Sequence, residues 1–197
     1  MIFAKLTAAV GLAALLSGCA PVVIGGIGAG AMSAAQTRST GEALTDAEIK
    51  LRINDALFQR DSTLFSRVQT SVTEGRVVLL GAVADGQERM LAEEVTRAIP
   101  EVREVTNELV VADRGWRDIA RDTRIDAEIA GRMLAAEDIL SINYDVETIN
   151  GVAHVMGLAQ DSAELARVTD LVSRVSGVRQ VVSHALLVTD PRRRTTG

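Results

Sequence analysis

Hydrophobic positions in this chain fall into short segments that alternate between helical and strand spacing. Ile49, Ile53, Ala56 and Leu57 follow the i, i+4, i+7, i+8 spacing of one helix face, and Thr45-x-x-Glu48 predicts a capping box at the start of that helix. Residues 68–72 then predict a strand, Glu74-Gly75 a turn, and the aliphatic run 76–80 a largely buried strand. This part of the chain therefore predicts helix, strand and strand.

A second helix and a last strand complete the unit. Asp85-x-x-Glu88 predicts the start of the helix, its apolar face carries Leu91, Val95, Ala98 and Ile99, and Pro100 ends it. Val102, Val105, Leu109 and Val111 are expected in the strand that follows.

The same order recurs in the second half of the chain. A helix from about Thr123 carries Ile125, Ile129, Met133 and Ala136 on one face. Strands at 143–149 and 152–156 flank Asn150-Gly151, a pair typical of a type I′ turn because both central positions need positive φ. A helix at 161–175 and a strand at 180–189 follow.

Matching residues set the offset between the two copies. Asp46-Ala47-Glu48-Ile49 recurs as Asp126-Ala127-Glu128-Ile129, 80 residues on, whereas Gly75, Gly81, Asp85 and Glu88 recur 76 residues on as Gly151, Gly157, Asp161 and Glu164. The difference predicts four extra residues between the first helix and first strand of copy one. Two copies are too few for a solenoid, so we expect two small α+β domains, at 42–113 and 117–190, that pack against each other.

The N-terminal residues have a different pattern. Lys5, the apolar run 6–16 and Leu16-Ser17-Gly18-Cys19 are typical of a signal peptide at 1–18, and the segment is too short to span a bilayer. Cys19 after the cleavage point resembles the lipobox of bacterial lipoproteins, which implies a diacylglyceryl and N-acyl lipid on that residue. Residues 19–41 are expected to form a tether. Gly26-x-Gly28-x-x-Ala31 fits a dinucleotide fingerprint only formally, because no strand precedes it.

Composition and charge narrow the function. Cleavage before Cys19 leaves 20 basic and 26 acidic residues, a net charge of −6 that disfavours nucleic-acid binding. No catalytic motif is present, and Cys19, the single cysteine, is assigned to the lipid. His154 and His184 lie in separate strands, are expected to be far apart, and indicate no metal site. Asp161 and Glu164 are interpreted as helix caps rather than paired catalytic carboxylates. We therefore expect no enzyme activity and no cofactor beyond the lipid.

The repeated unit resembles a BON domain. Gly75-x-Val77-x-Leu79-x-Gly81 with Val102 and Val105 carries the resemblance in copy one; Gly151-x-Ala153-x-Val155-x-Gly157 with Val175, Gly177, Val178 and Val181 carries it in copy two. Two such units behind a lipobox resemble the dual BON-domain outer-membrane lipoproteins of Gram-negative bacteria. The resemblance implies a non-enzymatic periplasmic protein that supports outer-membrane integrity and binds anionic phospholipid such as phosphatidylglycerol or cardiolipin. Some members associate with the division site. Ala20 fits sorting to the outer membrane.

The resemblance also implies a lipid-contacting region, the first helix of the second domain. Arg124, Glu128 and Arg132 share one stripe of that helix. Arg117 and Arg121 are placed in the linker or in an irregular first turn, because extending the helix would set Asp118 and Asp122 beside Ile125 and Ile129. Trp116 either meets the membrane interface or packs between the domains. The arginine stripe is either a lipid contact or a solvated face, and Arg192-Arg193-Arg194 in the tail 191–197 is either a second basic patch or a solvated end. The alternative function is an adaptor that docks onto another envelope protein.

Overall fold

A computed structural model describes residues 40–193, and the side chains from residue 45 onward. The signal peptide, Cys19, most of the tether and Arg194 lie outside the described residues. The first domain contains α2 (Thr40–Arg60), α3 (Ser62–Arg67), β1 (Val68–Thr73), β2 (Arg76–Val83), α4 (Gly86–Arg97), β3 (Glu104–Asn107) and β4 (Val110–Val111). The second contains α5 (Trp116–Ala135), the 3₁₀ turn η1 (Ser141–Asn143), β5 (Tyr144–Ile149), β6 (Val152–Ala159), α6 (Ser162–Ser173), β7 (Gln180–Ser183) and β8 (Leu186–Leu187).

The two domains have the same sheet topology, as the repeat predicts. The central strand, β2 or β6, pairs antiparallel with the strand before it and parallel with the last strand. The last strand is divided into two segments, β3 and β4 or β7 and β8, where a single strand was expected. The division lies opposite Gly81 and Gly157, whose φ values of 130° and 129° bend the central strand and interrupt the ladder.

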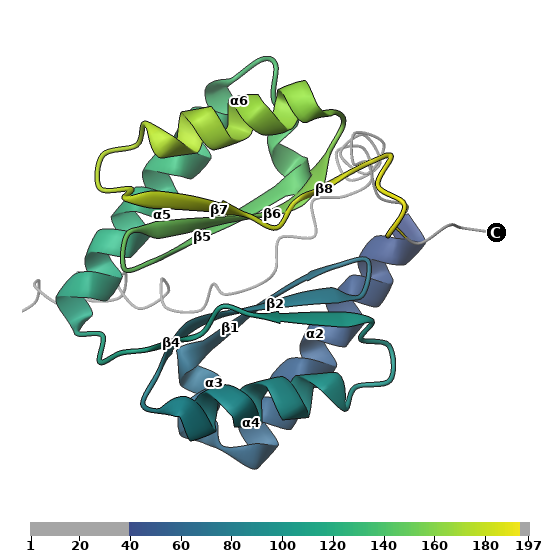
Figure 1. The fold of residues 1–197 in the computed structure, drawn as a ribbon, viewed down its shortest axis with the longest axis vertical. Coiled ribbons are helices and arrows are strands. Elements are labelled where there is room, and N and C mark those ends of the chain that lie inside the picture. The colour runs from purple at the N-terminus through teal and green to yellow at the C-terminus, as the bar shows by residue number, and fades with distance from the viewer. Residues whose placement is uncertain (1–39, 194–197) are drawn as a thin grey trace, which may run out of the picture.

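The domains pack sheet against sheet with their helices outside. Figure 1 shows β1 and β2 facing β5, β6 and β7, with α5 and α6 covering the far side of one sheet and α2, α3 and α4 that of the other. Each domain has its own aliphatic core between helices and sheet. A third, small cluster of Val78, Leu80, Ile149 and Met156 joins the two sheets. The expected packing of the two copies is therefore confirmed.

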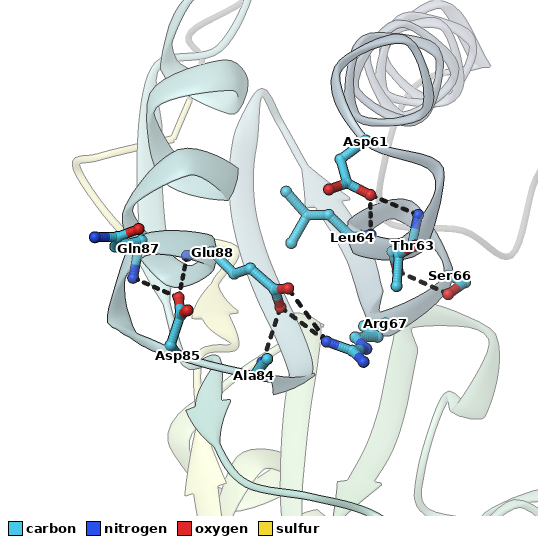
Figure 2. Close-up of polar contacts among 9 residues, drawn as sticks. All are labelled: Asp61, Thr63, Leu64, Ser66, Arg67, Ala84, Asp85, Gln87 and Glu88. Carbon is cyan, nitrogen blue, oxygen red and sulfur yellow. Dashed lines mark hydrogen bonds and ion pairs between the residues drawn. The ribbon is translucent and has the colours of Figure 1, made fainter.

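Helix starts follow the predicted capping residues in two cases of three. Asp85 accepts hydrogen bonds from the N–H groups of Gln87 and Glu88 at the start of α4, and Glu88 reaches back to the N–H of Ala84 (Figure 2). Asp161 caps α6 in the same way. The capping box predicted at Thr45 is wrong, because α2 begins at Thr40 and continues through that residue.

The hairpin turns adopt the predicted conformation. Asn150 and Gly151 have φ values of 51° and 76°, as a type I′ turn requires. Glu74 and Gly75, at 54° and 74°, form the same turn in the first domain. A glutamate is unusual at positive φ, and here its buried side chain is held by an ion pair between its Oε1 and Arg193 Nη2, 2.7 Å apart.

Candidate functional site

Helix α5 begins at Trp116, seven residues before the predicted start at Thr123. Arg117 and Arg121 are therefore part of the regular helix, and their placement in a linker or an irregular first turn is wrong. The objection to a longer helix was an acidic residue beside the apolar stripe. Asp122 is indeed 1% exposed, but its carboxylate accepts hydrogen bonds from the N–H groups of Asn150 and Gly151 and pairs with Arg114 at 2.7 Å. A buried charge is tolerated when it is paired and hydrogen-bonded in this way.

The solvent face of α5 has an apolar half and a basic half. Ile125, Ile129 and Met133 face the core. At 100° per residue, one side of the outer surface carries Trp116, Ala120, Ala127, Gly131 and Leu134, all exposed. The flank beside it carries Arg117, Arg121, Arg124 and Arg132, with Glu128 among them. Trp116 and Leu134, at opposite ends of the helix, are 74% and 80% exposed.

Trp116 lies on the surface and does not pack between the domains. Its indole ring is contacted by Arg117, whose guanidinium carbon lies 5.2 Å from the ring centroid. A guanidinium over an indole face is a favourable cation–π arrangement. The interpretation of Trp116 as a packing residue in the domain groove is therefore wrong.

The arginines of α5 differ in their ion pairs. Arg132 pairs with Glu128 at 2.6 Å, and Arg121 pairs with Asp118 at 3.2 Å. In the part of the chain that the structure describes, no carboxylate lies within ion-pair distance of Arg117 or Arg124. The unpaired positive charge of the helix is therefore concentrated toward its Trp116 end.

Two arginines of the C-terminal basic cluster, Arg192 and Arg193, form ion pairs within the protein. Arg192 pairs with Asp190 at 2.8 Å on the surface. Arg193 is only 19% exposed and spans the two domains, because it reaches the buried Glu74 while also donating to the carbonyl of Val188. Arg193 is thus neither a solvated tail residue nor a free cation.

His154 and His184 are neighbours, although the sequence suggested that they are far apart. Nδ1 of His154 lies 3.2 Å from Nε2 of His184, because β7 runs parallel beside β6 and the chain turns at the break before β8. Nothing in the local sequence signals this contact, which depends on strand pairing. Among residues 40–193, no group of three or more histidine, cysteine or acidic side chains is placed to hold a metal ion.

A polar cavity of about 600 Å³ between the domains contains two carboxyl groups that sequence analysis did not select. Burial raises the pKa of Asp126 to about 6, and the charge of Asp122 acts in the same direction, while hydrogen bonding to Thr148 opposes it. Burial raises the pKa of Glu147 to about 7, reinforced by the charge of Asp126. Both groups therefore titrate near neutral pH.

Comparisons with known proteins agree with this architecture. The family model described as BON domain matches residues 45–113 and 121–189. The outer membrane lipoprotein DolP of Haemophilus influenzae is 28% identical over 90% of this chain and 93% of its own length. The osmotically-inducible protein Y of Escherichia coli is 26% identical over 72% of each chain. An uncharacterized protein in the gshII 5′ region of Anaplasma centrale is 40% identical over 73% of this chain and 95% of its own.

These matches define the class of the protein. The chain belongs to the BON-domain family and contains two tandem BON domains. Across residues 40–193, none of the helices has the length and apolar character that crossing a membrane requires.

Proposed function

We propose that this protein is an outer-membrane lipoprotein, acylated at Cys19 and facing the periplasm, whose second BON domain binds anionic phospholipid through α5 and supports envelope integrity, including at the division site. It acts by binding lipid. It catalyses no reaction, uses no cofactor and binds no nucleic acid. Similarity to DolP over 90% of the chain supports the outer-membrane assignment.

The exposed face of α5 carries the lipid-binding proposal. An apolar strip that ends in Trp116 and Leu134 and is flanked by arginines has the composition of a helix that lies in the membrane interface. With 20 residues, α5 is about 30 Å long. Trp116 and Leu134, near its two ends, would therefore contact the membrane surface at well-separated points. Tryptophan favours the interface between headgroups and acyl chains.

Electrostatics would set which lipids are bound. Each basic residue near an anionic surface contributes about 1 kcal/mol, so Arg117 and Arg124 bias the choice of lipid and the orientation of α5 without holding the protein there alone. The acyl chains on Cys19 would hold it, because each buried methylene contributes about 0.8 kcal/mol.

Vesicle flotation of a non-acylated Cys19→Ser form tests the proposal. We expect binding to vesicles with phosphatidylglycerol or cardiolipin and not to pure phosphatidylcholine. Trp116→Ser with Leu134→Ser should weaken binding to vesicles of either anionic lipid, and Arg117→Glu with Arg124→Glu should weaken it further by removing the attraction to the anionic headgroups. Arg97→Glu with Arg174→Glu, an equal change of charge at exposed arginines of α4 and the end of α6, is the matched control. Equal binding by the α5 variants and the control would rule out α5 as the lipid contact.

A second candidate, an adaptor for another envelope protein, is favoured by one observation. Leu51 and Phe58 of α2 and Met90 of α4 are more than half exposed. Figure 1 shows these two helices on the opposite side of the molecule from α5. These residues lie on two helices that contact each other, and exposed apolar side chains on neighbouring helices are a surface that a partner protein can cover. Loss of envelope integrity in cells that carry Phe58→Ser, with vesicle flotation of the variant unchanged, would support this role.

A further inference from the structure

His154 and His184 form a direct imidazole–imidazole hydrogen bond. The two rings are 7° from parallel, and their centroids are 5.5 Å apart, whereas the facing nitrogens are only 3.2 Å apart. The rings therefore meet through their nitrogen edges rather than through their faces. In such a bond one nitrogen donates and the other accepts, so one hydrogen lies between Nδ1 of His154 and Nε2 of His184.

The pair lies between the two domains. Residues 154 and 156 of β6 point the same way, and Met156 belongs to the apolar cluster that joins the sheets. His154 is 4% exposed. Oε1 of Glu108, from the first domain, lies 3.8 Å from Nε2 of His184. The histidines thus form part of the contact that holds the domains face to face.

Few charged groups surround the pair. From the second domain, Glu147 of β5 lies directly across from His154 in the sheet. From the first domain, Arg76 of β2 and Glu104 of β3 line a small cavity with His184 and with Arg192 of the C-terminal segment, but Arg76 pairs with Glu104 and Arg192 with Asp190. Asp145 of β5 accepts from Ser71 of β1, and β1 faces this region with uncharged side chains such as Gln69. Glu108 is therefore the carboxylate placed to balance charge on the histidines, and Glu147 is the other acidic group beside the pair.

The apolar part of the interface is small. Four buried residues, Val78, Leu80, Ile149 and Met156, make up the cluster between the sheets. Polar contacts consequently account for much of what keeps the sheets together, and an unfavourable charge among them has a large relative effect.

We propose that the histidine pair is an acid-sensitive latch, which holds the two BON domains together until both imidazoles are protonated. A first added proton goes to an outward-facing ring nitrogen, so the shared hydrogen stays in place and Glu108 balances the charge. A second proton must occupy the remaining lone pair between the rings. The hydrogen bond is then lost, and two positive charges face each other inside the interface.

The titration of the surrounding groups supports this sequence of events. Burial lowers the pKa of both histidines below 6.5; for His154 the charge of His184 adds to the effect, and the Glu108 carboxylate opposes it in both. Because the pKa of Glu147 is about 7, that carboxyl is already neutral when the histidines gain their protons. Protonation of Glu147 itself relieves a buried charge and acts against opening, so the test must separate the two effects.

The chain contains two histidines, which makes the test direct. NMR titration of the imidazole signals should show two coupled steps rather than two independent ones. Hydrogen exchange, corrected for its intrinsic pH dependence, should show protection of β2, β5 and β6 falling roughly tenfold at the second of these two steps. The radius of gyration measured by X-ray scattering should rise at the same pH at which this protection falls.

Two variants keep a hydrogen-bonding group in place but cannot titrate. His154→Asn substitutes an amide near Nδ1, and His184→Gln substitutes one near Nε2; the double variant should retain protection of the interface at low pH. Glu147→Gln should open as the wild type does. Constant protection of the wild type through both imidazole titration steps, or opening of the double variant at the same pH as the wild type, would overturn the proposal.

Discussion

Asp46 and Asp122 hold the two hairpin turns of the protein in the same way. The carboxylate of Asp46 accepts hydrogen bonds from the N–H groups of Glu74 and Gly75 at 2.7 and 2.9 Å, and that of Asp122 accepts from Asn150 and Gly151 at 2.7 and 3.1 Å. Each aspartate thus ties the first helix of its domain to the turn between its first two strands. The two are 76 residues apart, the same spacing as the two turns.

Asp46→Ala should destabilise the protein by about 2–4 kcal/mol, because it leaves two buried backbone N–H groups without an acceptor. Urea denaturation measures the change as a lower transition midpoint. The matched control is Asp126→Asn, at the residue that sequence similarity pairs with Asp46. It should leave stability unchanged or slightly higher. A large loss in the control, or none in Asp46→Ala, would contradict this account of the turns.

Gly81→Ala and Gly157→Ala should each prevent folding of their domain. A Cβ at Gly81 would lie 2.1 Å from the carbonyl oxygen of Arg67, and one at Gly157 would lie 2.0 Å from that of Asn143, at φ values that other residues rarely adopt. Circular dichroism and thermal unfolding report the outcome. Gly86→Ala is the control, since a Cβ there meets nothing within 4 Å and stability should be retained.

Glu147→Gln should stabilise the protein at alkaline pH and have no effect in acid. Burial raises the pKa of this carboxyl from 4.5 to about 7, so the folded state carries a penalty that grows as pH rises from about 4.5 to about 7 and persists above that range. The group is partly exposed, so we expect a gain on the order of 1 kcal/mol at about pH 8. Thermal unfolding of the wild type and of Glu147→Gln, in acid and at about pH 8, measures the gain. Glu137→Gln, at an exposed glutamate, is the matched control.

Arg193→Ala should cost about 2 kcal/mol, because it removes the guanidinium beside the buried carboxylate of Glu74. Arg192→Ala, at the next residue, removes a surface ion pair with Asp190 and should cost less than about 0.5 kcal/mol. Denaturant unfolding compares the two. Equal losses would mean that the contact between the C-terminal segment and the first domain adds no stability.

The main helices and strands of both domains could be predicted from periodicity, turns and caps. The short helix α3, the division of the last strand and the alignment of the two first helices could not. Asp46-Ala47-Glu48-Ile49 resembles Asp126-Ala127-Glu128-Ile129, yet the structural partner of Asp46 is Asp122, and Ile49, Ile53 and Leu57 correspond to Ile125, Ile129 and Met133. The offset is 76 throughout, so the four extra residues expected in the first copy do not exist. A shift of four residues is about one helical turn and nearly preserves the apolar face, so hydrophobic pattern alone does not distinguish the two alignments.

The residues of the candidate site could be predicted from the sequence, but the start of the helix that carries them could not. Trp116, Arg121, Arg124, Glu128 and Arg132 do share one helix, but its start was misplaced because Asp122 was judged as an isolated charge. The carboxylate of Asp122 accepts hydrogen bonds from backbone N–H groups 28 and 29 residues away, and these become its neighbours only when the strands pair. The contact between His154 and His184 depends on the same information.

The central strands β2 and β6 are buried along almost their whole length, each between its own helices and the sheet of the other domain. Neither strand has a solvent-exposed side on which substitutions would be easily tolerated. Inherited variation should therefore accumulate on the outward surfaces of α2, α4, α5 and α6, where new binding preferences can arise without disturbing the paired architecture underneath.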